Sequence, residues 1–343
     1  MPPAPRAYQI KKTGVRGQLT PSRLTMPTLA PHQVLVQVCA ASLNYRDLLA
    51  LHNPTDLKEG LIPLSDAAGV ISAIGPDVTT WRVGDRVSPS FFPHWDSGPF
   101  RASYLQSALG GGQTDGVLCD EIIVSDNALV EIPAYLTLSE AATLPCAAVT
   151  AWHALFVRAH LTSGDTVLIQ GTGGVAMFAL QLATAHGVRA IVVSSSDQKL
   201  ERAVALGAWK TINYHKEPRW DRAVHRFTDN EGVSCVLELG GPDTFDRSLA
   251  AVAGGGTIAQ IGVLTGFGPQ ANLLPLQFKN ATICGICVGS RQHFSDLHRF
   301  MATHTIRPVI DRTFDFGEAP SAYAYLESAQ HFGKVVIDMG NDG

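Results

Sequence analysis

The stretch that decides the fold is TVLIQGTGGVAMFALQLATAHG, residues 166–187. Its first five residues are typical of a buried strand, and residues 173–187 are typical of a helix that ends at Gly187. The turn between them carries the pattern Gly-x-Gly-x-x-Ala, from Gly171 to Ala176. A strand, this turn and a helix together bind a dinucleotide pyrophosphate, because free N–H groups and the dipole at the helix N-terminus attract an anion. We therefore expect a dinucleotide site at this turn.

Each small residue of the turn has an expected task. Gly171 permits the tight turn, Gly173 lets a pyrophosphate approach the backbone, and Ala176 lets the helix pack close to the sheet. The other residues of the expected cradle are Thr172, Gly174 and Val175. The alternative is a tight strand-to-helix turn that binds nothing.

The sequence differs in character on the two sides of Asp165. After it, strand-like runs alternate with helical runs, which predicts a doubly wound parallel sheet of the α/β class. Before it, short apolar runs between Gly, Pro and Asp predict a β-rich region, with a helix over 139–156 and Ser139 as its N-cap. Residues 93–116 predict a long Gly-rich loop, either a lid or a mobile segment. A last predicted strand, residues 334–339, is able to return to the first domain.

The end of the strand after the turn indicates which dinucleotide binds. A site for NAD usually has a carboxylate there for the ribose 2′-hydroxyl. This chain has Ser194, Ser195 and Ser196, with Lys199 one helical turn later, while Asp197 falls in the loop. Hydroxyls and an ammonium suit a 2′-phosphate. We therefore expect NADPH rather than NADH, the alternative being that Lys199 is an ordinary surface residue.

Length and composition exclude several classes of protein. A chain of 343 residues is long enough for two domains. Its formal net charge of −4, without any basic run, argues against a nucleic-acid partner. No apolar run reaches the roughly 18 residues that span a bilayer, and Met1–Lys12 has no apolar core of a signal peptide. The six scattered cysteines fit buried thiols in a reducing cytoplasm, and the CxxC at Cys284–Cys287 has no second pair to complete a metal site.

Eight motifs are spread over nearly the whole chain: ASLNYRD (41–47), IPLSDAAGVISAIG (62–75), VGDRV (83–87), AATLPCAAVTAWHAL (141–155), GTGGVA (171–176), LGAWKTINY (206–214), GGTIAQIG (255–262) and FGKVVI (332–337). In these motifs the chain resembles the medium-chain dehydrogenase/reductase superfamily and, within it, the zinc-free quinone-oxidoreductase-like branch. The resemblance implies a GroES-like catalytic domain, residues 1–147 and 288–343, around a Rossmann domain, residues 148–287, with the active site in the cleft between them. It also implies a homodimer that pairs the strand TICGICVGS, residues 282–290.

The resemblance also assigns cofactor contacts to individual residues. Thr150 is expected to face the nicotinamide, and Lys199 and Tyr214 are expected to contact the adenosine phosphate. Lys334 falls where a cationic residue reaches the pyrophosphate. The residues expected along the carboxamide side of the nicotinamide are Gly240, Gly262 and Val263.

The departures from the zinc-dependent members predict a metal-free site. Asn44 stands in place of a Cys ligand and Ser65 in place of a His ligand, so only Cys146 of the three ligand positions keeps its thiol. Zinc needs about three protein ligands and an open position. The four-cysteine lobe that binds a structural zinc in relatives would lie within residues 90–120, where Cys119 is the only cysteine. We therefore expect neither zinc.

Without a metal, the chemistry favours a conjugated acceptor. Zinc contributes several kcal/mol by polarising a carbonyl, whereas a quinone or an enone spreads the developing charge by itself. Asn44 is a candidate donor to the substrate oxygen, and Tyr45 a candidate proton donor; the alternatives are that they only shape the loop and that the proton comes from water. Phe91, Phe92 and Trp95 stack on a flat substrate or pack in the core.

Three functions remain open at this point. The first is an NADPH-dependent reductase of quinones or enones. The second is an alcohol or aldehyde dehydrogenase that works without metal. The third is a dinucleotide-binding sensor or structural protein with little turnover.

Overall fold

The computed structural model describes residues 4–14, 16–266, 268 and 272–341. The chain divides into two compact units. The first unit is Met1–Val149 together with Gly289–Gly343, and the second unit is Thr150–Val288. Among the described residues, no helix has both the length and the apolar character needed to cross a membrane.

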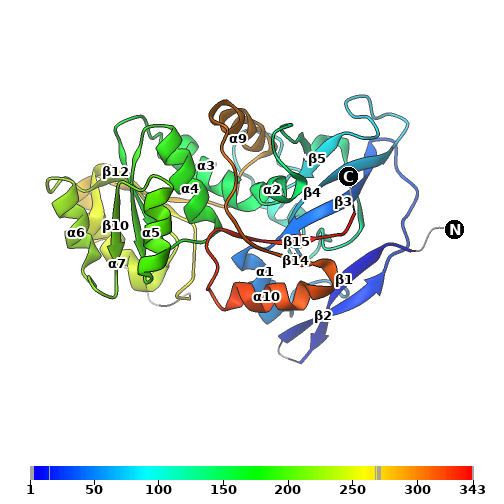
Figure 1. Cartoon of the computed structure of the whole chain (residues 1–343), viewed down its shortest axis with the longest axis horizontal. Helices are drawn as coiled ribbons and strands as arrows, with labels where there is room; N and C mark the ends of the chain where they lie inside the picture. Colours follow the sequence, from blue (N-terminus) through cyan, green and yellow to red (C-terminus); the bar gives the residue numbers. More distant parts are fainter. Residues whose placement is uncertain (1–3, 15, 267, 269–271, 342–343) are drawn as a thin grey trace. The chain divides into compact units, whose positions relative to one another are not determined.

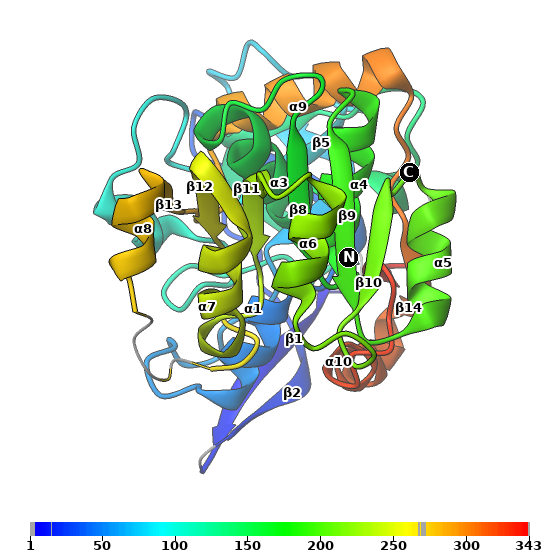
Figure 2. The same ribbon diagram turned by 90° about the vertical axis from the view of Figure 1, so that its left-hand side faces the viewer.

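The second unit contains a parallel sheet of six strands in the order β10-β9-β8-β11-β12-β13 (Figure 2). Every neighbouring pair in this sheet is parallel. In the part of the chain that the structure describes, β13 lies at one edge. The strands are β8 (Thr166–Gln170), β9 (Arg189–Ser194), β10 (Lys210–Asn213), β11 (Val233–Glu238), β12 (Val252–Gln260) and β13 (Thr282–Gly285).

Helices cover this sheet. The helices α6 and α7 lie in front of the strands in Figure 2, and apolar side chains such as Trp220 and Leu249 join Val236 in the core between them and the sheet. The helix α4 packs against β8 and β9, with Phe178 buried. The expected doubly wound α/β fold is confirmed. The helices are α4 (Gly174–Ala185), α5 (Asp197–Ala205), α6 (Trp220–Phe227), α7 (Pro242–Ala251) and α8 (Leu274–Lys279).

The first unit contains a seven-stranded sheet in the order β14-β15-β3-β4-β5-β7, with β6 paired to β3 (Figure 1). A separate hairpin of β1 and β2 lies beside it, and α10 (Ala319–Glu327) covers the sheet with apolar residues such as Tyr323. The strands are β1 (Arg6–Thr13), β2 (Arg16–Arg23), β3 (Gln33–Ser42), β4 (Asp66–Ile74), β5 (Arg86–Pro89), β6 (Glu121–Ser125), β7 (Leu129–Glu131), β14 (Ile310–Asp315) and β15 (Lys334–Asp338).

Three neighbouring strands of this sheet bring distant residues together. The last strand, β15, pairs antiparallel with β3, so that Val336 lies opposite Ser42. On its other side β3 pairs with β4, so that the same Ser42 lies opposite Asp66. The N–H of Leu43 donates to Val335 O at 3.1 Å. Residues just beyond β3 therefore meet the first residue of β4 and the first residue of β15.

The expected helix over 139–156 is wrong in its start and its regularity. The helix α2 (Leu138–Ala141) begins two residues earlier than Ser139 would allow, with Thr137 as N-cap accepting from Glu140 N at 3.1 Å. Two π-helical segments, residues 144–148 and 153–158, flank α3 (Val149–Trp152). Threonine caps a helix as serine does, and Glu140 completes the cap by accepting from Thr137 N at 2.8 Å.

The predicted loop at 93–116 contains the short 3-10 helix η1 (Ala102–Ser107) and a buried anchor. Trp95 is 2% exposed, stacks on Tyr104 with ring centroids 5.9 Å apart, and donates from its indole N–H to Gly98 O at 3.0 Å. Arg291, in the first turn of α9 (Arg291–His304), donates from its backbone N–H to Trp95 O at 2.9 Å. The segment is therefore tied to the first unit by its own aromatic residues.

Candidate active site

A buried ion pair lies at the meeting point of β15, β3 and β4. Lys334 is 2% exposed and Asp66 is fully buried, and the ammonium lies 3.7 Å from the Asp66 carboxylate. The same ammonium donates to Leu43 O at 2.7 Å and to Asn44 Oδ1 at 2.6 Å. A buried ammonium is tolerated only when such acceptors surround it. The expected pyrophosphate contact would therefore require Lys334 to leave, or to share, three acceptors of its own unit.

Asp66 ties this pair to the other positions expected from the metal-dependent relatives. Its Oδ1 accepts from the Ser65 hydroxyl at 2.7 Å, and its Oδ2 accepts from the Cys146 N–H at 3.1 Å. Burial raises the pKa of the Cys146 thiol well above its usual range, and the negative charge of Asp66 adds to this effect. Asn44, Ser65 and Cys146 thus surround one lysine–aspartate pair.

A second carboxylate fixes the backbone of Asn44. The Asp47 side chain accepts from the Asn44 N–H at 2.7 Å and lies 3.4 Å from the Arg46 guanidinium. Burial raises the pKa of Asp47 to about 6, although Arg46 and the Asn44 N–H act in the opposite direction. Arg46 also donates to Leu109 O and Gly110 O, both at 2.9 Å. The loop at Asn44 is therefore held from several sides.

The two expected catalytic residues differ in their surroundings. Asn44 has a buried side-chain nitrogen, Nδ2, without a hydrogen-bond partner in the described part of the chain. Tyr45, the first residue of α1 (Tyr45–His52), is 40% exposed. An unpartnered buried donor costs about 1–3 kcal/mol, so Asn44 Nδ2 is a place where a ligand oxygen would be stabilised.

The three aromatic residues expected at the substrate lie in a packed cluster. Phe92 and Trp95 are 1% and 2% exposed, and their ring centroids are 6.0 Å apart. Phe91 packs edge-to-face on Phe92 at 4.6 Å, and the Arg46 guanidinium lies 5.1 Å from its centroid. This burial supports the packing alternative for Phe92 and Trp95.

The expected phosphate cradle lies between β8 and α4 in the second unit. Gly171 has a φ of +76°, in the left-handed region that favours glycine, and its N–H donates to Val193 O at 2.7 Å. Gly173 is the N-cap of α4 and provides no side chain to its N–H groups. Val175 and Gly174 are half-buried in the first turn, whereas Thr172 is 5% exposed. The turn leaves the helix N-terminus open to an anion, so the residues present fit a dinucleotide pyrophosphate.

The serines beyond β9 lie beside the end of β10. Ser194 lies opposite Asn213 and accepts from the Tyr214 N–H at 3.1 Å, which brings Tyr214 to this strand end. Ser196 caps α5, since its hydroxyl accepts from Lys199 N at 3.4 Å, and Ser195 is exposed. Serine hydroxyls, rather than a carboxylate, therefore occupy this strand end.

The nearest carboxylate, Asp197, is held by other residues. It accepts from Lys216 Nζ at 2.6 Å and from Asn213 Nδ2 at 2.8 Å. The hydrogen bond from Lys216 lowers the pKa of Asp197 below its usual range, and the one from Asn213 acts in the same direction. The charge of Asp197 is thus already paired within the second unit.

A buried carboxylate that the sequence did not single out holds the next turn. Glu238, the last residue of β11, is fully buried. Its Oε1 accepts from the N–H groups of Gly240 and Gly241 at 3.0 and 2.9 Å, and from the Thr244 hydroxyl at 2.6 Å. Its Oε2 accepts from Ser248 and from Gln170, the latter at 2.9 Å. Two side chains at the carboxyl ends of adjacent strands, Gln170 of β8 and Glu238 of β11, therefore fix the backbone at Gly240.

The remaining expected cofactor residues lie in the second unit. Gly262 comes after β12, and its backbone lies close to that of Leu239. A Cβ at this position would lie 2.1 Å from Leu239 O, so only glycine fits there. Val263 comes next and is half-buried, and Thr150 is 3% exposed. Gly262 and Gly240 thus lie on two neighbouring strand ends, at the carboxyl edge where dinucleotides bind in such sheets.

Comparison with known proteins places the chain in a family. The family model described as "Alcohol dehydrogenase GroES-like domain" matches residues 30–134, and the one described as "Zinc-binding dehydrogenase" matches residues 174–303. A zinc-type alcohol dehydrogenase-like protein of Schizosaccharomyces pombe is 42% identical over 331 residues, which cover 94% of this chain and 95% of the relative. The chain belongs to the medium-chain dehydrogenase/reductase superfamily.

Two further comparisons agree with this assignment. The acryloyl-coenzyme A reductase of Metallosphaera sedula is 30% identical over 91% of this chain and 93% of its own length. A crystal structure from Sinorhizobium meliloti 1021, described provisionally as an alcohol dehydrogenase, is 40% identical with a TM-score of 0.92, over 99% of this chain and 100% of that one. This dehydrogenase/reductase is an NAD(P)-dependent oxidoreductase, which favours the enzyme hypotheses over a protein with little turnover.

Because one matching family is described as zinc-binding, we tested the three expected ligand positions of this dehydrogenase/reductase for a zinc ion. The Asn44 oxygen is bound by an ammonium, the Ser65 hydroxyl donates to Asp66, and burial raises the pKa of the Cys146 thiol. The Lys334 charge would also repel a dication. These residues do not fit a zinc ion. In the described part of the chain, no group of three or more His, Cys, Asp or Glu residues has the geometry of a metal site.

Proposed function

We propose that this protein is an NADPH-dependent reductase of conjugated acceptors, quinones or enones, and that it works without zinc. The observation that carries the proposal is the buried Lys334–Asp66 pair. A protein cation lies among the three residues that stand in place of metal ligands. Such a site has hydrogen-bond donors for a developing negative charge but no Lewis acid.

This donor set suits an acceptor that delocalises charge. A few hydrogen bonds stabilise a developing oxyanion by a few kcal/mol, less than is needed for a plain ketone. In a quinone or an enone, conjugation spreads the charge before any protein group contacts it. The name of the Metallosphaera sedula relative, a reductase of an acryloyl thioester, agrees with a conjugated acceptor.

The strand end at Ser194 supports NADPH as the reductant. Ser195 and Ser196 offer hydroxyls to a 2′-phosphate, and Lys199 and Tyr214 lie on the adjoining helix and strand end. Asp197, the carboxylate that would otherwise select NADH, is paired with Lys216.

The residues of the chain have separate tasks in this proposal. The turn from Gly171 to Val175 holds the pyrophosphate, and Gly240, Gly262 and Val263 line the nicotinamide carboxamide. The cofactor, when bound, supplies the hydride. Asn44 Nδ2 donates to the acceptor oxygen, and the proton that completes the reduction comes from Tyr45 or from water.

A metal-free alcohol dehydrogenase remains the second candidate, because the family models and several relatives carry that name. The test is NADPH oxidation by the purified protein after dialysis against a chelator, with a benzoquinone, an aliphatic enone and a simple aldehyde as acceptors. We expect turnover of the quinone and the enone, and elemental analysis well below one zinc per chain. Faster turnover of the aldehyde would favour the alcohol dehydrogenase, and about one zinc per chain would contradict zinc independence.

A further inference from the structure

The contacts of Lys334 fix which way the Asn44 amide points. An ammonium has hydrogen-bond donors and no acceptor, so the Asn44 atom at 2.6 Å from Lys334 Nζ must be the oxygen. The reversed amide would place an NH₂ group against an NH₃⁺ group. The usual ambiguity between the two ends of an asparagine amide is therefore absent here.

The opposite end of the same amide is the unpartnered donor. Asn44 Nδ2 is buried and has no hydrogen-bond partner among the described residues. Since Oδ1 is held by Lys334, Nδ2 cannot satisfy itself by turning the amide over. The side chain is thus fixed with a free donor at the position where a zinc-dependent relative has a metal ligand.

The ammonium that fixes the amide is itself held firmly. It contacts Leu43 O at 2.7 Å and the Asp66 carboxylate at 3.7 Å. The Asp66 carboxylate is held in turn by Ser65 and by the Cys146 N–H. These partners come from β15, from the residues after β3 and from β4, which are hydrogen-bonded neighbours in one sheet.

The positive charge also changes the strength of the free donor. A charge-assisted hydrogen bond to the amide oxygen draws electron density away from the nitrogen, so the N–H groups become better donors. A donor that is already aimed costs no reorganisation when the negative charge appears on the substrate.

We propose that Lys334 is a positioning residue that orients and polarises the Asn44 amide, so that Nδ2 stabilises the oxyanion of the acceptor. This inference rests on the proposed reduction of a carbonyl acceptor and deepens it. In this inference, Lys334 does not bind the cofactor pyrophosphate. Its ammonium acts on the substrate through Asn44.

The variants must avoid a stranded carboxylate. Replacing Lys334 alone would leave Asp66 buried without its counter-ion, and the fold would suffer. We therefore pair each change with Asp66→Asn. The variant Lys334→Met with Asp66→Asn removes both the donor and the charge. The variant Lys334→Gln with Asp66→Asn keeps a neutral donor for Asn44 Oδ1. It is the matched control for the Met variant, because Asp66→Asn alone would leave the Lys334 ammonium buried without its counter-ion.

The kinetic readout separates positioning from cofactor binding. Relative to the wild type, we expect the Met variant to lower kcat for an enone by about 10²–10³, the effect of losing one oxyanion donor. The Gln variant should recover part of that loss, because it still orients the amide. The Kd for NADPH should change by less than about threefold, since about tenfold is the effect of losing a strong charged contact. An unchanged kcat, or a tenfold rise in the Kd with kcat unchanged, would overturn the proposal and favour pyrophosphate binding.

A second readout does not depend on turnover. In protein labelled with ¹⁵N at asparagine, the Asn44 side-chain signal, assigned with Asn44→Ser, should move in the Met variant and stay near its original position in the Gln variant. The same signal in both variants would refute an orienting role. If the wild type turned over no conjugated acceptor while the signal moved as expected, the proposed substrate class would fail and the positioning role would stand.

Discussion

Two adjacent residues, Asn44 and Tyr45, show how sharply environment can change along a chain. The Asn44 amide is fixed by a buried ammonium and leaves its nitrogen without a partner. Tyr45 is 40% exposed. Asn44 lies two residues beyond the end of β3 and is the N-cap of α1, whose first residue is Tyr45.

Removal of the Tyr45 hydroxyl tests whether this residue donates the proton. If it does, Tyr45→Phe should lower turnover of an enone by about 10²–10⁴, the range of general acid catalysis. Turnover of a quinone should fall less, because its reduced oxygens take protons from water. The Kd for NADPH, measured by fluorescence, should not change. Undiminished turnover of both acceptors would leave water as the donor.

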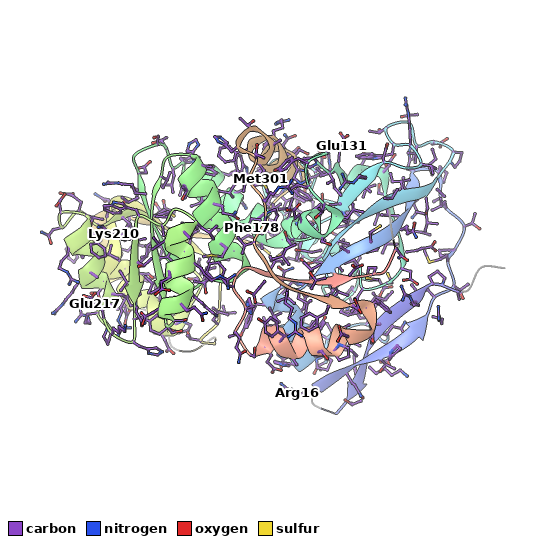
Figure 3. The ribbon with its side chains drawn as sticks, viewed as in Figure 1. Arg16, Glu131, Phe178, Lys210, Glu217 and Met301 are labelled. Atoms are coloured by element: carbon purple, nitrogen blue, oxygen red, sulfur yellow. The ribbon has the colours of Figure 1, made fainter. Side chains whose placement is uncertain are left out.

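The choice between NADPH and NADH can be tested at Lys199. A charge-assisted contact of about 1.5–3 kcal/mol corresponds to roughly tenfold or more in affinity. Lys199→Ala should therefore raise the Kd for NADPH about tenfold and leave that for NADH nearly unchanged. Lys210, labelled in Figure 3, lies at the opposite end of β10 from Tyr214, so Lys210→Ala is the control and should change neither. Equal losses of both cofactors in Lys199→Ala would assign Lys199 to stability or to a shared contact.

At this scale the sequence predicted residue types better than residue partners. Asn44 and Ser65 were recognisable because they replace metal ligands in a familiar motif. The pairing of Lys334 with Asp66 was not, because a strand register joins residues that lie in distant parts of the chain. Glu238 was missed for a related reason: within an apolar strand, a single carboxylate gives no sign that five donors surround it.

At the scale of elements, the alternation of strand-like and helical runs after Asp165 predicted the parallel sheet of the second unit. The hydrophobic pattern did not predict strands whose burial is one-sided or slight. The strand β2 has no fully buried residue, so the hairpin of β1 and β2 carries no clear alternation. The prediction of a regular helix within residues 138–158 was wrong for another reason. Pro145 lies inside the apolar run, and the backbone there is π-helical. A propensity pattern gives helical character but not the hydrogen-bond spacing.

The packing of α9 on β7 makes a prediction about acid stability. His298 of α9 is 5% exposed, donates from Nδ1 to Glu131 O at 2.9 Å, and has a second ring nitrogen without a partner in the described residues. Figure 3 labels Glu131 on β7 and Met301 on α9, which contact each other as elements. Burial lowers the pKa of His298 to about 4.

Below pH 6.5 the unfolded chain binds a proton at this histidine, whereas the folded chain does not until about pH 4. Stability should therefore fall as the pH drops through this window, by about 3 kcal/mol for a shift of this size. Urea unfolding at intervals between pH 7 and 4 should show a flatter dependence for His298→Asn than for the wild type. The exposed His304 of the same helix is the control, and His304→Asn should keep the wild-type slope. Equal slopes in all three proteins would contradict the prediction.

At the scale of the whole molecule, the two units have separate hydrophobic cores, each built on its own sheet. The family and the doubly wound fold were predictable because motifs along nearly the whole chain agree with one another. Assembly into a dimer was predicted from the resemblance alone. The second unit adds an observation: beside β12 and the edge strand β13, α8 exposes Phe278 by 79% and Leu274 by 56%.

We expect two chains to pair at this edge, because exposed strand edges and apolar patches are common at interfaces. Light scattering should give twice the 36.6 kDa of one chain. Phe278→Glu should shift the mass toward that of a single chain, by placing a charge in the contact. Val204→Glu, at an exposed position on α5 near the other edge of the sheet, should leave the mass unchanged. A wild-type mass of one chain, or a stronger effect at Val204, would contradict this arrangement.

Because the first unit is divided into two pieces of the chain, it is completed after the second unit during synthesis. Residues 150–288 lie between those pieces, so the ribosome completes the whole second unit before it reaches β15. Until then β3 lacks one strand neighbour and Asp66 lacks its counter-ion. At about 5–20 residues per second, Lys334 follows the end of the second unit by roughly 2–9 s. If Lys334 orients Asn44 as proposed, a nascent chain contains the whole second unit before it can orient that side chain.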